Sequence, residues 1–167
     1  FLYRHEGPSP VYNVLATMHM RERVDVAHHL LALKTLTRRH EALRTRFAEH
    51  DGVPYRIVEP AVVLRTPVVD LGGLSDPVLR EQETRRLIAE EESRLFALDR
   101  APILHSLLLL LADDEHVMVI NIHHIVTDAW SMSVLVRDYG SVLEAISAGR
   151  APAPSAPART YRDFAWW

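Results

Sequence analysis

Two adjacent histidines, His123 and His124, followed by Asp128, are the side chains of this sequence best suited to chemistry. An imidazole has an ordinary pKa of about 6.5, so near neutral pH it can exchange a proton with an amine or a hydroxyl. An apolar run at 117–122 leads into the pair, and a helical pattern begins a few residues after it. The histidines are therefore expected at the end of a buried strand, where functional sites are commonly built.

The two histidines are expected to have different roles. Neighbouring side chains of a strand point to opposite faces, so only one of His123 and His124 can face a given cleft. Asp128 lies four residues after His124. It could orient a ring nitrogen, cap the following helix or pair with an arginine elsewhere.

Two other interpretations of the pair stay open from the residues alone. Two histidines beside a core strand could be purely structural, and His-x-x-x-Asp resembles the spacing of metal ligands, although no third ligand is placed by the sequence. Neither a phosphate-binding glycine loop nor a Gly-x-Ser-x-Gly nucleophile motif occurs. The residues therefore indicate acid–base chemistry at a strand end, and they name no substrate.

The composition is that of a globular protein with one substantial core. The chain has 167 residues, of which 48% are hydrophobic and 25% are charged. A net charge of -3 without a basic block argues against nucleic acid as a partner. There is no cysteine for a disulfide or thiolate metal site, and we find neither a signal peptide nor an apolar run of about 18 residues. We expect no membrane segment and a cytoplasmic protein.

The hydrophobic periodicity predicts an α/β fold, in the sense of an α+β sandwich with helices packed on a mixed, largely antiparallel sheet. An Asp51-Gly52 turn predicts a β-hairpin, and the acidic turn at 113–115 predicts a second antiparallel pair. The expected strands are 14–20, 43–48, 53–58, 62–69, 103–111 and 116–122. Helices are expected at 25–40, at 76–98, and from a few residues after the histidines to Gly149 as the C-cap.

Both ends of the sequence suggest a piece of a longer polypeptide. The chain begins abruptly at Phe1, and four aromatic residues within 161–167 would leave an apolar patch that needs a partner surface. Segment 151–160 alternates proline with small residues and is expected to be a linker or an extended crossover.

Three motifs together resemble the condensation domains of nonribosomal peptide synthetases. His123–Ser131 resembles the family's His-His-x-x-x-Asp-Gly-x-Ser active-site motif. Arg39–Phe47 is similar to Arg-His-Glu-x-Leu-Arg-Thr-x-Phe, and Tyr161–Trp166 is similar to Tyr-x-Asp-Phe-Ala-x-Trp. The motifs occur in the family's order and rough spacing, and they cover nearly the whole chain.

The resemblance implies that residues 1–167 are the N-terminal half of a condensation domain, and that this half is truncated at both ends. Its two lobes both resemble chloramphenicol acetyltransferase and form a V, so 161–167 would begin the connection to a missing C-terminal lobe. The complete domain would form a peptide bond between upstream and downstream carrier-protein thioesters, next to an adenylation domain, in secondary-metabolite or antibiotic biosynthesis. No cofactor is expected to bind directly, because the substrates arrive on 4′-phosphopantetheine arms.

The resemblance also implies a role for each motif residue. His124 would contact the reacting amine, either as a base or as a positioning group, and His123 would be structural. Asp128 would form a salt bridge that shapes the site, with Arg44 favoured over Arg39 because Arg44 is expected on a strand. Loss of a buried partner costs several kcal/mol, so removing Asp128 should disorder the lobe, whereas removing His124 should leave it folded.

Ala129 departs from the family pattern, which usually has glycine there. Glycine permits a positive φ or a close backbone approach, so alanine can serve only if φ stays negative, and its methyl group would narrow the acceptor side of the channel. Trp130 and Ser131 follow the pattern, with Ser131 a candidate cap for the next helix. Segment Glu6–Asn13 is similar to one found in condensation domains that accept a donor ending in a D-residue.

Two alternatives remain within the resemblance. One is an acyltransferase of the same superfamily that uses an acyl thioester and an alcohol or amine acceptor. The other is a catalytically silent relative that recruits tailoring enzymes, although such relatives commonly alter the first motif, which is intact here. An isolated lobe should be inactive, because the channel for both phosphopantetheine arms is expected between the lobes. The donor and acceptor amino acids do not follow from the sequence.

Overall fold

Two central strands form a hairpin because two long apolar runs flank a short acidic turn. The computed structural model describes residues 7–23 and 25–152. Its elements follow in the order η1 (Pro10–Tyr12), β1 (Asn13–Met20), α2 (Val26–Arg39), η2 (Glu41–Arg44), β2 (Thr45–His50), β3 (Val53–Val58), β4 (Val68–Asp70), α3 (Pro77–Glu92), β5 (Leu104–Ala112), β6 (Glu115–His123) and α4 (Ala129–Ser147).

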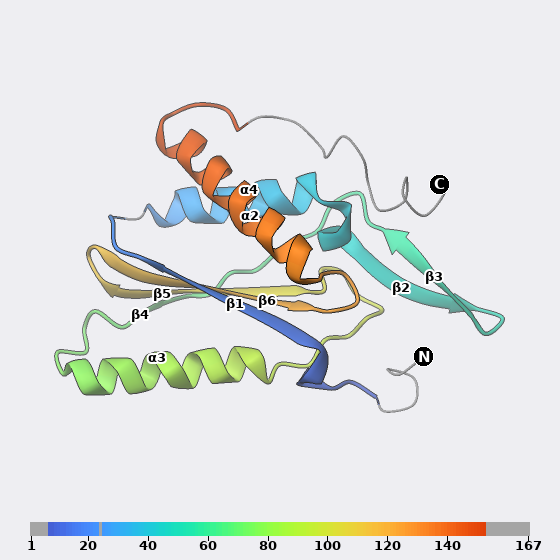
Figure 1. Cartoon of the computed structure of the whole chain (residues 1–167), viewed down its shortest axis with the longest axis horizontal. Helices are drawn as coiled ribbons and strands as arrows, with labels where there is room; N and C mark the ends of the chain where they lie inside the picture. Colours follow the sequence, from blue (N-terminus) through green and yellow to red (C-terminus); the bar gives the residue numbers. More distant parts are fainter. Residues whose placement is uncertain (1–6, 24, 153–167) are drawn as a thin grey trace.

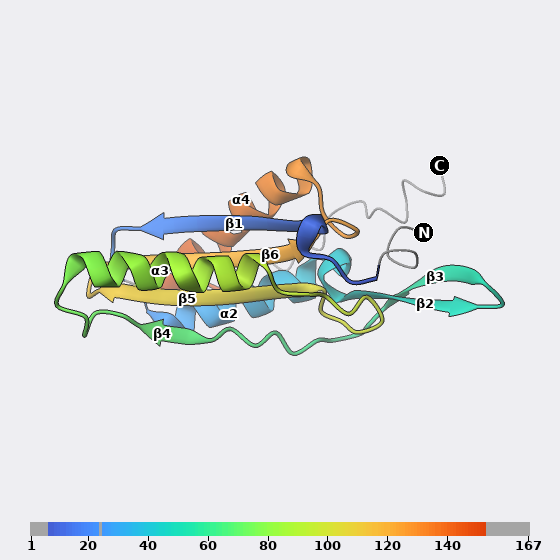
Figure 2. The ribbon, with the colours of Figure 1, turned by 90° about the horizontal axis from the view of Figure 1, so that it is seen from below.

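The main sheet has the strand order β1-β6-β5-β4. β6 pairs antiparallel with both β1 and β5, whereas β4 pairs parallel with β5. The predicted mixed, largely antiparallel sheet is therefore confirmed. The β2–β3 hairpin forms a separate two-stranded sheet, and it extends beyond the end of the main sheet at which β6 ends (Figures 1 and 2).

Helices cover both faces of the main sheet, with α2 and α4 on one face and α3 on the other (Figure 1). Successive side chains of β5 and β6 point to opposite faces of the sheet, so each strand contacts both helix layers. Leu108 and Met118 pack in the cluster with α2 and α4, whereas Leu109 and Val117 pack in the cluster facing α3. All four side chains are fully buried. This double burial explains why the two strands show continuous apolar runs instead of clear alternation.

The helix ends follow local sequence signals. Asp25, Asp76 and Asp128 accept hydrogen bonds from the first turns of α2, α3 and α4. After α4, Gly149 has a φ of 67°, and its N–H and that of Arg150 donate to the Ile146 and Ala145 carbonyls, as in a Schellman motif. In the described part of the chain, no helix is both long and apolar enough to cross a membrane.

The second motif was predicted to form a continuous strand from residue 43, and this prediction is wrong. Residues 41–44 form the 3-10 helix η2, and β2 begins only at Thr45. The Thr45 hydroxyl donates to the Glu41 carbonyl, and the Leu43 N–H donates to that of His40, so this segment turns tightly after α2. Arg44 therefore lies at the end of a helical turn and not on a strand.

Two other predicted boundaries were wrong. α3 ends at Glu92 instead of 98, because Phe96 and Leu98 leave the helix to form a separate buried cluster with Ile103. Only residues 68 and 69 of the predicted strand 62–69 pair with the sheet, and the observed strand continues to Asp70. Pro67 lacks an N–H for the ladder, and its carbonyl instead accepts from the Leu108 N–H.

Candidate active site

The histidine pair lies where β6 ends, and the two side chains have opposite environments. His123 is buried, with 6% of its surface exposed, whereas His124 is exposed. The His124 N–H donates to the Tyr12 carbonyl at 2.7 Å, which ties the residue directly after β6 to η1. The Val126 N–H donates to the His123 carbonyl at 3.1 Å, so the chain turns immediately.

The buried side chain of His123 stabilises this turn. Its Nδ1 accepts a hydrogen bond from the Ile125 N–H at 3.0 Å, so in the neutral ring the proton lies on Nε2. The rings of Tyr12 and Phe96 lie 5.9 and 6.0 Å from it, and Nε2 is buried without a hydrogen-bond partner among the described residues. Burial, and to a lesser degree His124, lowers the pKa of His123, which keeps the ring neutral at neutral pH.

Asp128 is the N-cap of α4. Its Oδ1 accepts from the Ser131 N–H at 2.7 Å and from the Ser131 hydroxyl at 2.6 Å. These hydrogen bonds, with a smaller contribution from nearby His124, lower the pKa of Asp128. Of the three roles open from the sequence, helix capping is the one observed. Ser131 is not the cap itself but the third helical residue, which donates to the cap.

The expected salt bridge between Asp128 and an arginine of the second motif is absent among residues 7–23 and 25–152. Arg44 Nη1 donates instead to the Glu59 carbonyl, and Arg44 Nε is buried without a partner in the described part of the chain. Arg39 Nη1 lies 3.4 Å from Asp138 Oδ2 on α4. Asp128 is exposed and already bonded to Ser131, so the predicted pairing with Arg44 or Arg39 is wrong in this structure.

Ala129 fits its position without strain. It is the first residue of α4, and among the described residues other than glycine only Asp51 has a positive φ. A glycine is therefore not required here for backbone conformation. The neighbouring Trp130 side chain is 80% exposed on the first turn of the same helix.

A pocket of about 440 Å³ lies beside His124 and joins the first two motifs. Its walls come from the histidine loop, the start of α4, η2 and the β2–β3 hairpin, and the lining residues are Ala42, Thr45, Phe47, Arg56, His124, Ile125, Val126, Thr127, Asp128 and Ser131. Thr45 and Phe47 alternate on β2 and Arg56 pairs with Phe47, so these three side chains share one face of the hairpin.

The hairpin residues of this pocket were not identified as site residues from the sequence. Strand alternation could have grouped Thr45 with Phe47, because both belong to the second motif. Nothing in the sequence indicated that Arg56, on β3, would line the same pocket as His124.

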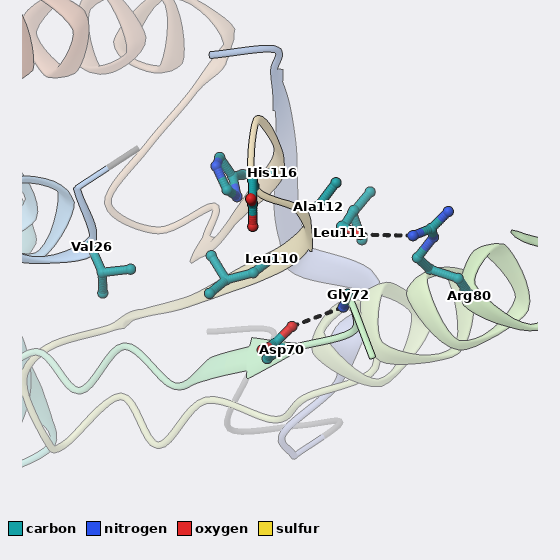
Figure 3. Close-up of a pocket in the computed structure, with 9 residues that line it drawn as sticks. Val26, Asp70, Gly72, Arg80, Leu110, Leu111, Ala112 and His116 are labelled. Carbon is teal, nitrogen blue, oxygen red and sulfur yellow. Dashed lines mark hydrogen bonds between the residues drawn. The ribbon is translucent and has the colours of Figure 1, made fainter. Parts of the chain in front are cut away.

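A second pocket, of about 500 Å³, lies near the start of β6 and includes His116 (Figure 3). His116 precedes His123 by seven residues, a rise of roughly 23 Å along the strand. Two polar side chains that line this second pocket already form hydrogen bonds with the backbone: Asp70 accepts from the Gly72 N–H, and Arg80 donates to the Leu111 carbonyl. This pocket is therefore remote from the histidine motif.

Neither site shows a metal-ligand set. Within residues 7–23 and 25–152, no three or more His, Cys, Asp or Glu side chains are grouped so that they could hold a metal ion. The third sequence motif, Tyr161–Trp166, and the 151–160 crossover beyond residue 152 lie outside the described residues.

Comparison with known proteins identifies the family. The family model described as "Condensation domain" matches residues 1–167, the full length of this chain. The chain belongs to the condensation domain family of nonribosomal peptide synthetases.

Curated relatives are much longer than this chain. A linear gramicidin synthase of Brevibacillus parabrevis is 36% identical over 167 residues, which are 100% of this chain but 2% of that protein. The phosphinothricin tripeptide synthetase PhsC of Streptomyces viridochromogenes is 38% identical over 168 residues, which are 100% of this chain but 15% of that protein. The chain thus spans only a small part of the relatives that it matches.

Solved condensation domains share the fold of this chain. The first condensation domain of the calcium-dependent antibiotic synthetase, in complex with substrate analogue 2a, is 26% identical with a TM-score of 0.83, covering 93% of this chain and 37% of that one. The X-domain in complex with OxyB from teicoplanin biosynthesis is 30% identical with a TM-score of 0.81, covering 93% and 32%. The fold is thus of the chloramphenicol acetyltransferase-like type.

Proposed function

We propose that this chain is the N-terminal lobe of a condensation domain that forms a peptide bond between two carrier-bound substrates. The α-amine of the downstream aminoacyl thioester attacks the carbonyl of the upstream thioester. The new C–N bond replaces the C–S bond, the upstream thiol leaves, and the amine proton is released. The lengthened chain then remains on the downstream carrier.

One observation carries this proposal: the imidazole of His124 is exposed, and the preceding residue, His123, is buried and stabilises the turn that follows. The His124 N–H is bonded to the Tyr12 carbonyl, and the next N–H, that of Ile125, is bonded to the His123 side chain. These two hydrogen bonds fix the turn that places the His124 ring at the pocket. Positioned groups of this kind lower the entropic cost of bringing reactants together, and a nearby imidazole can also accept the amine proton. His124 therefore contacts the amine, and Asp128, Ala129, Trp130 and Ser131 form the helix start beside it.

The proposal includes the partners of the complete domain. Upstream and downstream carrier proteins deliver their substrates on phosphopantetheine arms, and an adenylation domain loads the acceptor. A second lobe completes the channel, so 1–167 alone is inactive. The synthetase works in the cytoplasm.

The experiment is reconstitution of the complete domain with donor and acceptor carriers loaded with amino acids. The dipeptide should appear on the acceptor carrier, detected by mass spectrometry of the intact carrier. Transfer to free alcohol or amine acceptors, without carrier-bound peptide, would instead indicate the superfamily acyltransferase.

A silent recruiting domain is the second candidate, favoured by the similarity to the X-domain that was solved with OxyB. Against it stands the intact pair of His123 and His124 with the ring of His124 exposed to a pocket. Absence of any product in the reconstitution, together with stable binding of a tailoring enzyme, would support this second candidate.

A further inference from the structure

Arg56 is a cation in the His124 pocket for which the described part of the chain provides no ion-pair partner. It is half-buried on β3, opposite Phe47 of β2, and both side chains line the pocket with His124. A partly desolvated guanidinium without an anion is unfavourable, and its planar fork suits bidentate binding of a carboxylate or phosphate.

The neighbouring arginines are already engaged. Arg46 Nε bonds to the Glu59 carboxylate at 2.5 Å, and Arg44 donates to the Glu59 carbonyl. Asp128 lines the same pocket as Arg56, but it accepts its hydrogen bonds from Ser131, and no ion pair joins it to Arg56 among residues 7–23 and 25–152. The pocket face of the hairpin thus presents a positive charge to whatever enters beside His124.

Arg56 and His124 line the same pocket, so an anion bound by Arg56 must lie close to the group that His124 contacts. The phosphate of a phosphopantetheine arm lies at the far end of the extended arm from the reacting thioester, so it falls outside this space when the amine is at His124. The side-chain carboxylate of an aspartyl or glutamyl acceptor is only a few bonds from its α-amine and remains inside.

We propose that Arg56 is a specificity-determining residue that selects an acceptor amino acid with a carboxylate side chain. This inference rests on the proposed function, in which His124 meets the acceptor amine. A charge-assisted, bidentate contact to the acceptor carboxylate favours glutamate over its isostere glutamine. The expected preference in kcat/KM is about 10- to 100-fold.

The test compares acceptor carriers loaded with glutamate, glutamine or lysine, using the complete domain and one fixed neutral donor. The wild type should prefer glutamyl to glutaminyl acceptor by about 10-fold or more. Arg56→Gln should bring the ratio close to one, Arg56→Lys should restore part of it, and Arg56→Glu should shift the preference toward the lysyl acceptor. Arg65→Gln, on an exposed loop residue outside the pocket, should keep the wild-type ratio.

The outcomes separate this inference from the function on which it rests. Peptide formation with equal rates for glutamyl and glutaminyl acceptors would overturn the role of Arg56 and leave the condensation activity standing. The same holds if a second series, with glutamate or glutamine on the donor carrier and a fixed neutral acceptor, shows a preference for glutamate that the acceptor series does not show. No peptide from any acceptor would overturn both proposals.

Discussion

At the scale of single residues, His123 supports the turn that presents His124. Replacing His123 by phenylalanine keeps the ring in its apolar surroundings but leaves the Ile125 N–H without its acceptor. Because Ile125 is 46% exposed, losing this hydrogen bond should lower the free energy of unfolding in chemical denaturation by only about 0.5–1.5 kcal/mol, with slower peptide formation.

Asparagine provides the matched control for this substitution, because its side-chain oxygen can replace Nδ1 as the acceptor. His123→Asn should recover part of both the stability and the rate lost in His123→Phe. Equal losses in the two variants would show that the hydrogen bond to Ile125 does not matter.

Asp128 gives a prediction that differs from the sequence-based one. Because it is an exposed N-cap and forms no buried ion pair in the described structure, Asp128→Ala should lower the melting temperature only modestly and leave the domain folded. Asp128→Asn, which keeps an acceptor oxygen for Ser131, should stay close to the wild type. Unfolding of the complete domain on Asp128→Ala, seen by circular dichroism, would restore the salt-bridge interpretation.

At the scale of elements, the second motif ties α2 to α4 through Asp138. His40 Nε2 and Arg39 Nη1 lie 3.0 and 3.4 Å from Asp138 Oδ2, and the three side chains are only 12–17% exposed. Asp138→Ala leaves both partners without this carboxylate, so the complete domain should lose about 2–3 kcal/mol of unfolding free energy in urea titrations.

Glu144→Ala is the matched control on the same helix. Its ion pair with Arg150 is largely exposed, at 79% and 63% for the two side chains, and should contribute less than about 1 kcal/mol. Comparable losses for the two variants would mean that Asp138 has no special role in joining the helices.

Most elements were predictable because they depend on local signals. The Asp51-Gly52 turn, the N-cap of α2 and the apolar runs of β5 and β6 identified the elements that the structure shows. The end of α3 was not predictable from periodicity, since Phe96 leaves the helix for a distant cluster. Three asparagine hydrogen bonds from β1 and β6 to the carbonyls of Glu91, Glu92 and Arg94 also depend on tertiary structure.

The candidate site was predictable only in part, for the same reason. The motif placed His123 and His124 correctly at a strand end, but partner choice depends on which elements meet in space. Asp138, nearly a hundred residues from Arg39 in the chain, could not be recognised as the partner of the second motif. Arg56 likewise reaches the pocket only through the register of the β2–β3 hairpin.

At the scale of the whole molecule, burial lowers the pKa of several histidines, which predicts acid-sensitive folding. His40, His105 and His123 have lowered pKa values, and that of His29, fully buried beside Tyr139, falls to about 4. In the unfolded chain a histidine titrates at about 6.5, so between these values the unfolded state binds more protons. Stability should therefore be fully present above pH about 6.5 and fall as the pH drops toward 4.

Urea titrations of the complete domain between pH 7.5 and 5 measure this dependence. His29→Phe should reduce the slope of unfolding free energy against pH by up to about one proton, whatever its effect on stability at pH 7.5. An unchanged slope in His29→Phe would show that His29 does not contribute to the acid sensitivity.

The central claim is that His124 acts on the acceptor amine, and the single-turnover rate of peptide formation in His124→Ala tests it most directly. With both carriers preloaded, the variant should form the peptide about 10²- to 10⁴-fold more slowly than the wild type. Its melting temperature should be unchanged, because the removed side chain is exposed. A folded His124→Ala enzyme with a rate within a few-fold of the wild type would contradict the claim.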